Sequence, residues 1–144
     1  MKKLFFVLSL FASTSCDEEA VSVGSINESK MLDINDTKQF VMIRGGNSNN
    51  PVLLHLHGGP GVSELGGLRK YNRDLEKDFT VVYWDQRAAG KSFVANSPVS
   101  EIKVSKYVEN VNELAKYLKK RLNVNKIGSL TFFVEKPFSI FKTD

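Results

Sequence analysis

The chain has 144 residues, of which 42% are hydrophobic and 25% charged, a composition typical of one globular domain rather than of a disordered or fibrous protein. Its formal net charge is +4, but Lys2 and Lys3 contribute two of the positive charges and no basic block follows them. This distribution argues against nucleic-acid binding, and the only cysteine, Cys16, excludes an internal disulfide.

The N-terminal segment 1–16 has the features of an export signal. Two lysines precede the apolar run Leu4–Ala12, which is too short to span a bilayer, and small residues lead to Cys16. Cys16 resembles the acceptor of a bacterial lipoprotein, so we expect lipidation there and attachment to a membrane of the cell envelope. The alternative is cleavage by ordinary signal peptidase near Ser15, which would leave a periplasmic or secreted protein.

A tether and a hairpin are expected next. Residues 17–30 are polar and lack periodicity, so we expect a flexible tether. Two short strands, Met31–Ile34 and Gln39–Arg44, are separated by Asn35-Asp36, which is typical of a hairpin. The continuous apolar run Val52–Leu56 then predicts a strand buried on both faces.

Helical periodicity marks two later segments, in which apolar residues recur every three to four positions. We expect one helix over about Glu64–Lys77 and a second over Ser105–Leu122. Between them Phe79–Trp84 is a second strand of the buried type, and the next strand begins at Ile127. Strands alternating with helices are typical of an α/β protein, whose site is expected at the carboxyl ends of the strands.

Two motifs follow the apolar strands. His57-Gly58-Gly59-Pro60-Gly61 comes directly after Val52–Leu56, and the sequence YWDQRAAGKS occupies Tyr83–Ser92. Glycines allow positive φ and a close approach of the main chain to a ligand, so backbone N–H groups of the first motif can converge on an oxyanion. A loop of this kind indicates acyl-transfer chemistry.

Together, and in this order, the two motifs resemble α/β-hydrolases of the prolyl iminopeptidase type over about Gln39–Ile127. The resemblance implies the N-terminal part of an α/β-hydrolase fold, with an N-terminal hairpin, parallel strands and flanking helices in an incomplete sheet. It assigns one oxyanion-hole amide to Gly59 and implies that Asp85 and Arg87 brace the site, through each other or nearby backbone. The residues that would organise the loop are His57, Gly58, Pro60 and Gly61. The family needs no cofactor.

The only histidines are His55 and His57, which both precede the point where the family places its nucleophile. The position of His57 matches the loop motif, so we expect it to organise the loop through hydrogen bonds rather than to act as a general base. The motif contains no Asp, Glu or Cys that could join the two histidines as a ligand, so we expect no metal site.

Ala88 departs from the resemblance because the family usually has glycine at this position. If the backbone there requires positive φ, the β-carbon would cost on the order of 1 kcal/mol or more.

A larger departure concerns the catalytic triad. The family continues after Ile127 into a Gly-x-Ser-x-Gly elbow, but Ser129 is followed by Leu130 and Thr131, and Ser139 fits no better. We therefore expect residues 31–127 to form a partial hydrolase domain and 128–144 an aberrant tail. On this interpretation the chain is a truncated serine hydrolase, ended by a frameshift or a misassigned end, and it is inactive because nucleophile, acid and base are missing. Full-length relatives would act on small peptides or esters, as proline iminopeptidase-like aminopeptidases or esterases.

Two alternatives belong to other classes of function. The chain could be a non-catalytic, surface-displayed binding protein, which the missing triad allows but which no motif supports. It could also be a nucleotide-binding module, because Ala89-Gly90-Lys91-Ser92 is similar to the end of a phosphate loop. That pattern needs glycine where Asp85 stands, and a carboxylate there would repel phosphate.

Overall fold

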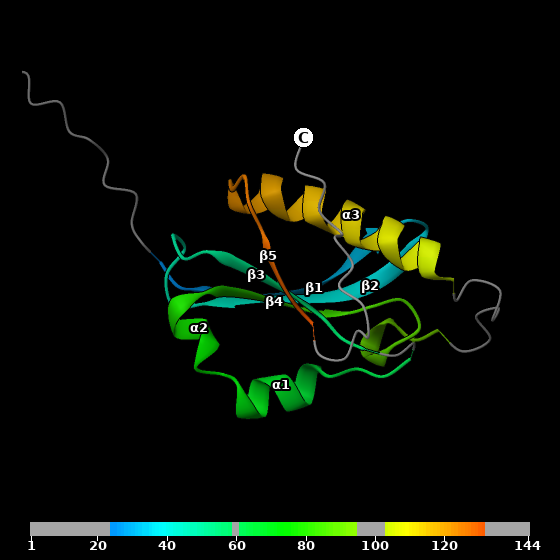
Figure 1. The fold of residues 1–144 in the computed structure, drawn as a ribbon, viewed down its shortest axis with the longest axis horizontal. Coiled ribbons are helices and arrows are strands. Elements are labelled where there is room, and N and C mark those ends of the chain that lie inside the picture. Colours follow the sequence, from blue (N-terminus) through cyan, green and yellow to red (C-terminus); the bar gives the residue numbers. More distant parts are fainter. Residues whose placement is uncertain (1–23, 59–60, 95–102, 132–144) are drawn as a thin grey trace, which may run out of the picture.

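The computed structural model describes residues 24–58, 61–94 and 103–131, which build a mixed sheet between one long helix and two short ones (Figure 1). The strand order across the sheet is β1-β2-β4-β3-β5. β1 and β2 form an antiparallel pair and β2 is antiparallel to β4, whereas β3 runs parallel to both β4 and β5. The strands are β1 Ile26–Ile34, β2 Thr37–Gly45, β3 Val52–Leu56, β4 Thr80–Asp85 and β5 Gly128–Thr131.

The predicted hairpin is present, but both strands are longer than expected. Asn35 and Asp36 have φ of 43° and 66°, and two consecutive positive φ values are typical of the turn that matches the twist of paired strands. β1 begins at Ile26, so the tether boundary predicted at Lys30 is wrong. Side chains over Ile26–Lys30 alternate between half-buried and exposed, and such a strand is amphipathic without containing an apolar run.

The single helix predicted over Glu64–Lys77 is wrong, because two short helices occupy this segment. α1 covers Leu65–Tyr71 and α2 covers Leu75–Asp78. Asn72 leaves helical geometry, with φ −122° and ψ 22°, while its N–H donates to the carbonyl of Leu68. Asn72 therefore ends α1 within the stretch that the periodicity assigned to one helix.

The helix predicted over Ser105–Leu122 is confirmed as α3, Val104–Leu122. It ends at Asn123, which has the left-handed conformation that often follows a helix. α3 covers one face of the sheet, and α1 and α2 lie on the other (Figure 1). The core under α3 consists of Ile34, Val41, Ile43, Val52, Leu54, Leu56, Val82, Trp84, Val111, Leu114 and Leu118. The core on the opposite face consists of Phe40, Met42, Leu68, Val81 and Tyr83.

β5 begins one residue after the predicted start at Ile127 and pairs in parallel with Leu53–Leu56 of β3. The assignment of all of 128–144 to an aberrant tail is therefore wrong for Gly128–Thr131. The chain returns from α3 to the free side of β3, where backbone pairing is available to residues of any type. Residues 132–144, the expected signal 1–16 and the tether up to residue 23 lie outside the described residues.

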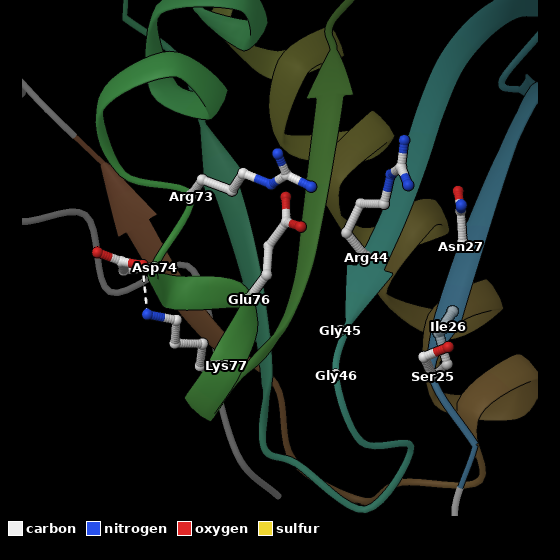
Figure 2. Close-up of a pocket in the computed structure, with 10 residues that line it drawn as sticks. All are labelled: Ser25, Ile26, Asn27, Arg44, Gly45, Gly46, Arg73, Asp74, Glu76 and Lys77. Atoms are coloured by element: carbon white, nitrogen blue, oxygen red, sulfur yellow. Dashed lines mark ion pairs between the residues drawn. The ribbon is translucent and has the colours of Figure 1, made fainter.

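A cavity of about 350 Å³ opens at the end of the sheet where β1 and β4 begin and β2 finishes (Figure 2). The glycine motif follows the carboxyl end of β3, so the cavity and the predicted site lie at opposite ends of the parallel strands. No helix in the described ranges is long and apolar enough to cross a bilayer.

Candidate functional site

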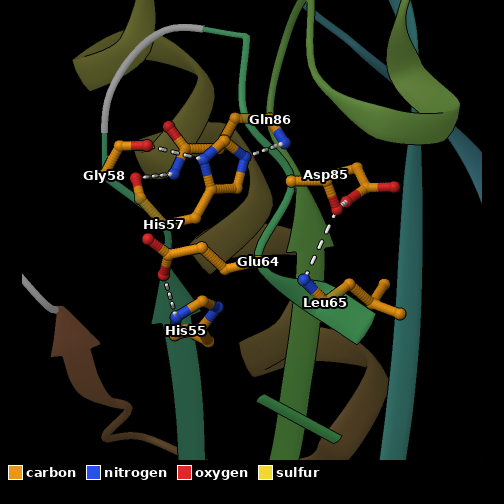
Figure 3. A network of polar contacts seen from close by, with 8 residues as sticks. His55, His57, Gly58, Glu64, Leu65, Asp85 and Gln86 are labelled. Carbon is orange, nitrogen blue, oxygen red and sulfur yellow. Dashed lines mark hydrogen bonds and ion pairs between the residues drawn. The ribbon is translucent and has the colours of Figure 1, made fainter. Parts of the chain in front are cut away.

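The two sequence motifs meet at one edge of the sheet because they follow neighbouring parallel strands. His57 and Gly58 continue β3, while Asp85 ends β4 and Gln86 follows it (Figure 3). Gly61 is described and has φ +88°. Gly59 and Pro60 lie outside the described residues, so the expected oxyanion-hole amide of Gly59 stays a prediction.

His57 joins the loop after β3 (residues 57–64, here called the glycine loop) to the loop after β4. The backbone N–H of Gln86 donates to Nε2 of His57 at 3.0 Å, and the side-chain amide of Gln86 donates to the His57 carbonyl at 2.9 Å. Nδ1 of His57 lies 3.3 Å from the carbonyl of Gly58. Because Nε2 accepts a hydrogen bond, the proton is assigned to Nδ1, directed at the Gly58 carbonyl. The buried ring thereby fixes the start of the glycine loop.

Asp85 holds the far side of the glycine loop. The residue is 2% exposed, and its carboxylate accepts hydrogen bonds from the Ser63 hydroxyl and, at 2.9 Å, from the N–H of Lys91. Ser92 donates its hydroxyl to the Asp85 carbonyl and accepts the N–H of Phe40 at 2.7 Å. The Asp85 carboxylate thus links the glycine loop to the loop after β4 through charge-assisted hydrogen bonds, and Ser92 links the Asp85 carbonyl to β2.

Arg87 links the same edge of the sheet to the hairpin turn and to α3. Its Nη2 donates to the carbonyl of Asn35 at 2.6 Å, and its own carbonyl accepts the hydroxyl of Tyr107 at 3.2 Å. The Asn35 side chain in turn donates to Asn110 on α3 at 3.1 Å. Of the two partnerships expected for Arg87, the structure records the one with nearby backbone.

Ala88 has φ +64°. The backbone at this position therefore has the positive φ at which a β-carbon costs free energy. The turn brings the Ala88 carbonyl to the glycine loop, where a β-carbon on Gly61 would lie 3.6 Å from it. The two loops thus pack backbone against backbone, and the family's glycine at this position has a conformational reason.

Replacing Ala88 with glycine is expected to raise the free energy of unfolding by about 0.5 kcal/mol. Relief of left-handed strain, about 1 kcal/mol or more, outweighs the entropy that glycine adds to the unfolded chain. The matched control is Ala89→Gly, because Ala89 is fully buried with φ −120° and should lose stability. Urea unfolding of both variants measures the difference, and a destabilised Ala88→Gly would contradict the strain argument.

His55 lies inside the sheet, one residue before the end of β3, with 1% of its surface exposed. Its Nε2 is 3.3 Å from a carboxylate oxygen of Glu64, which precedes α1 (Figure 3). Burial lowers the pKa of His55 from its ordinary value of 6.5, and the Glu64 carboxylate opposes this to a smaller degree. The described residues contain no group of three or more side chains placed to hold a metal ion.

His55 should make stability depend on pH in a definite direction. Its folded pKa is below 6.5, so the unfolded chain takes up the proton first as pH falls. Stability is then lost from about pH 6.5 downward until the folded ring is itself protonated. Urea unfolding of the native chain and His55→Gln at about pH 7.5 and pH 5 tests this. The native chain should exceed His55→Gln in free energy of unfolding by less at the lower pH. An equal change with pH in both chains would contradict a lowered pKa of His55.

The remaining sequence candidates do not join this cluster. Ser129 is exposed in the middle of β5, where it pairs with Leu54, and does not occupy a turn. Ser139 and Cys16 lie outside the described residues. In the phosphate-loop alternative, Gly90–Ser92 forms a short 3-10 helix, and the N–H of Lys91 is occupied by the Asp85 carboxylate.

Sequence reasoning missed three contributors, Glu64, Ser63 and Asn35. Ser63 and Glu64 are short-range neighbours of the glycine loop and contained no motif signal of their own. Asn35 was assigned to a turn, and its carbonyl reaches Arg87 only because the sheet places β2 beside β4.

Comparisons with known proteins identify hydrolases that this chain is similar to. No family model matches the chain. It is 37% identical over 103 residues to a probable aminopeptidase of Bacillus subtilis (strain 168), which covers 72% of this chain and 32% of that protein. It is 30% identical over 99 residues to a probable proline iminopeptidase of Leptolyngbya boryana, covering 69% of this chain and 29% of the relative. The chain spans about a third of the length of these curated relatives.

Solved structures give the same result. The crystal structure of a proline iminopeptidase-related protein from Thermus thermophilus has a TM-score of 0.62 and 29% identity, covering 74% of this chain and 36% of that one. An epoxide hydrolase from Vigna radiata, with a TM-score of 0.58 and 23% identity over 73% of this chain and 31% of its own, shares the fold alone. The homologues of this chain are thus proline iminopeptidase-like α/β-hydrolases, its structural neighbours include such proteins and epoxide hydrolases, and its described residues form the N-terminal part of the α/β-hydrolase fold.

Proposed function

We propose that this chain provides the oxyanion-loop portion of a serine hydrolase that acts on small peptides or esters. The observation that carries the proposal is the pair of bonds from Gln86 to His57, which fix the start of the glycine loop against the loop after β4. The Bacillus subtilis relative, a probable aminopeptidase, favours release of an N-terminal residue such as proline over ester cleavage.

The chemistry would follow the general scheme of acyl transfer without a cofactor. The backbone N–H of Gly59 would donate to the oxyanion that forms when a serine attacks the substrate carbonyl, and a second amide would follow that serine. Water would then release the acyl group. His57, Gly58, Pro60 and Gly61 would set the loop conformation, and Asp85 would hold it through Ser63.

These residues should not turn over substrate by themselves. Both ring nitrogens of His57 face backbone groups, at 3.0 Å and 3.3 Å, so this imidazole is not placed to accept a proton from a nucleophile. Ser129 is in a regular strand rather than on the strained turn that exposes a nucleophilic serine. An oxyanion hole accelerates only a reaction that a nucleophile has begun.

A chimera tests the positive part of the proposal. Residues 24–131 would replace the corresponding segment of the Bacillus subtilis relative, with the rest of that protein supplying the remaining elements. We expect hydrolysis of proline p-nitroanilide or p-nitrophenyl acetate by the chimera, and neither turnover nor fluorophosphonate labelling of the chain alone. A folded but inactive chimera would refute the oxyanion-loop role, and labelling of the chain alone would refute its inactivity.

We also propose that the chain is exported and carries lipid on Cys16. The support is the order of charged, apolar and small residues before the cysteine. Labelled fatty acid should be incorporated by the native chain and not by Cys16→Ser. Equal labelling of both would exclude acylation at Cys16, and the absence of label from both would favour a periplasmic or secreted protein.

A further inference from the structure

We propose that Arg44 and Arg73 flank a binding site for a phosphate group, at the end of the sheet opposite the glycine loop. The proposal is independent of the proposed hydrolase function, because it concerns residues of other segments. The site would take the phosphate of a small phosphorylated molecule or of a lipid headgroup, which share the same charged oxygens.

The proposed phosphate site is the cavity of about 350 Å³ where β2 ends beside α2 (Figure 2). Arg44 is on β2, directly opposite Asn27 of β1 in the strand register. Arg73 lies in the turn between α1 and α2, and the two arginines approach the cavity from different elements (Figure 2). The lining residues are Ser25, Ile26, Asn27, Arg44, Gly45, Gly46, Arg73, Asp74, Glu76 and Lys77.

The acidic residues of the cavity are already engaged. Asp74 pairs with Lys77 at 2.7 Å. Glu76 accepts the hydroxyl of Tyr83 at 2.8 Å and lies 3.8 Å from Nε of Arg69. Each carboxylate of the lining thus has its own partner, which leaves the positive charges of the two arginines in excess at the cavity.

Arg44 and Arg73 have no such partner within the part of the chain that the structure describes. No hydrogen bond or ion pair there reaches either guanidinium group, and Nε of Arg44 is buried without an acceptor. A buried donor that lacks an acceptor loses its water without compensation, so the site is one where a bound acceptor would be favourable.

Phosphate suits this arrangement better than a carboxylate does. A guanidinium group presents paired N–H donors that match two oxygens of one phosphate, and two arginines can engage different oxygens of the same group. The side-chain amide of Asn27 adds a neutral donor beside Arg44 (Figure 2). A dianion also gains more than a monoanion from two positive charges.

The test is a titration of the full chain with inorganic phosphate at low ionic strength, followed through the arginine Nε–H resonances by ¹⁵N NMR. We expect a saturable shift of the Arg44 signal. Arg44→Gln and Arg73→Gln should each weaken binding about tenfold or more, because each removes charged hydrogen bonds to the ligand. Arg73 is exposed, so its variant leaves the fold intact.

Lys38→Gln is the matched control, since it removes the same charge from the opposite end of β2, where Lys38 is exposed beside Asp33. The control should bind phosphate as the native chain does. Equal weakening by Arg73→Gln and Lys38→Gln would show a general charge effect and overturn the proposal. A shift that does not saturate would overturn it as well.

A second arm separates the two sources of phosphate. Vesicles of phosphatidylglycerol in phosphatidylcholine, and of phosphatidylcholine alone, would be sedimented with the chain and its variants. Binding to the anionic vesicles that is lost in Arg44→Gln and Arg73→Gln but kept in Lys38→Gln would assign the site to a lipid headgroup. Phosphate binding without vesicle binding would assign it to a small phosphorylated molecule.

Discussion

Replacing Gly90 with alanine is expected to lower the free energy of unfolding by about 3 kcal/mol, because the turn after β4 has no room for a β-carbon. Gly90 has φ +48°, and a β-carbon there would lie 2.4 Å from one carboxylate oxygen of Asp85. The carboxylate would have to leave its position, and with it the bonds to Ser63 and the Lys91 N–H. Left-handed strain adds to this loss.

Gly67→Ala is the matched control for Gly90→Ala. Gly67 lies in α1, and a β-carbon at this position would meet no atom within 4 Å. Alanine is a better helix former than glycine, so this variant should be stabilised by about 0.5–1 kcal/mol. Urea unfolding followed by circular dichroism measures both variants. If Gly90→Ala unfolded at the same urea concentration as the native chain, the bonds of the Asp85 carboxylate to Ser63 and Lys91 would not contribute to stability as proposed.

Truncation of Leu54 to alanine should cost about 3 kcal/mol, the central value for removing a fully buried leucine from a packed core. Leu54 is in the middle of β3 and is 0% exposed, and its side chain belongs to the core between the sheet and α3. The substitution loses the transfer energy of the side chain and leaves a space that rigid neighbours fill only in part.

Leu53→Ala provides the comparison for Leu54→Ala. Leu53 is the preceding residue, so its side chain points to the other face of β3, where it is half-buried near Gly128 of β5. We expect a loss of about 1 kcal/mol there, since less apolar surface is removed from water. Equal losses at the two positions would contradict the assignment of the larger core to the face under α3.

The sequence predicted the elements whose signal is carried by their own residues. The apolar run Val52–Leu56 and the periodicity of Ser105–Leu122 define β3 and α3 to within one residue. The hairpin was recognised from the polar Asn35-Asp36 pair, which adopts positive φ as such residues do. A full strand from Ile26 was not predicted, because its pairing with β2 depends on backbone bonds that any alternating sequence can make.

The interruption of the predicted helix has a similar cause. Leu65, Leu68 and Leu75 keep a helical spacing, but Asn72 and two glycines weaken the segment between them. Periodicity indicates which residues face a core. It cannot by itself distinguish one helix from two helices that pack on the same face of the sheet.

The candidate site depends on contacts between segments that are distant in the sequence. The sequence identified Ala88 as a departure from the family's glycine and gave the cost of a positive φ there, but only the structure shows that φ is positive. The contacts of Arg87 with Asn35, and of His55 with Glu64, required the fold, because each joins residues from separate segments. Gly59, on which the proposed chemistry depends, lies outside the described residues.

The contacts of Arg87 also bear on how this part of the molecule opens. Its guanidinium group holds the hairpin turn at Asn35, and its carbonyl holds Tyr107 of α3. A fluctuation that frees the loop after β4 must therefore break contacts in two other segments, so small local openings are disfavoured relative to larger cooperative ones. Amide protons of this loop, such as that of Ala89 bonded to the Gln86 carbonyl, should exchange with deuterium as slowly as those at the centre of the sheet.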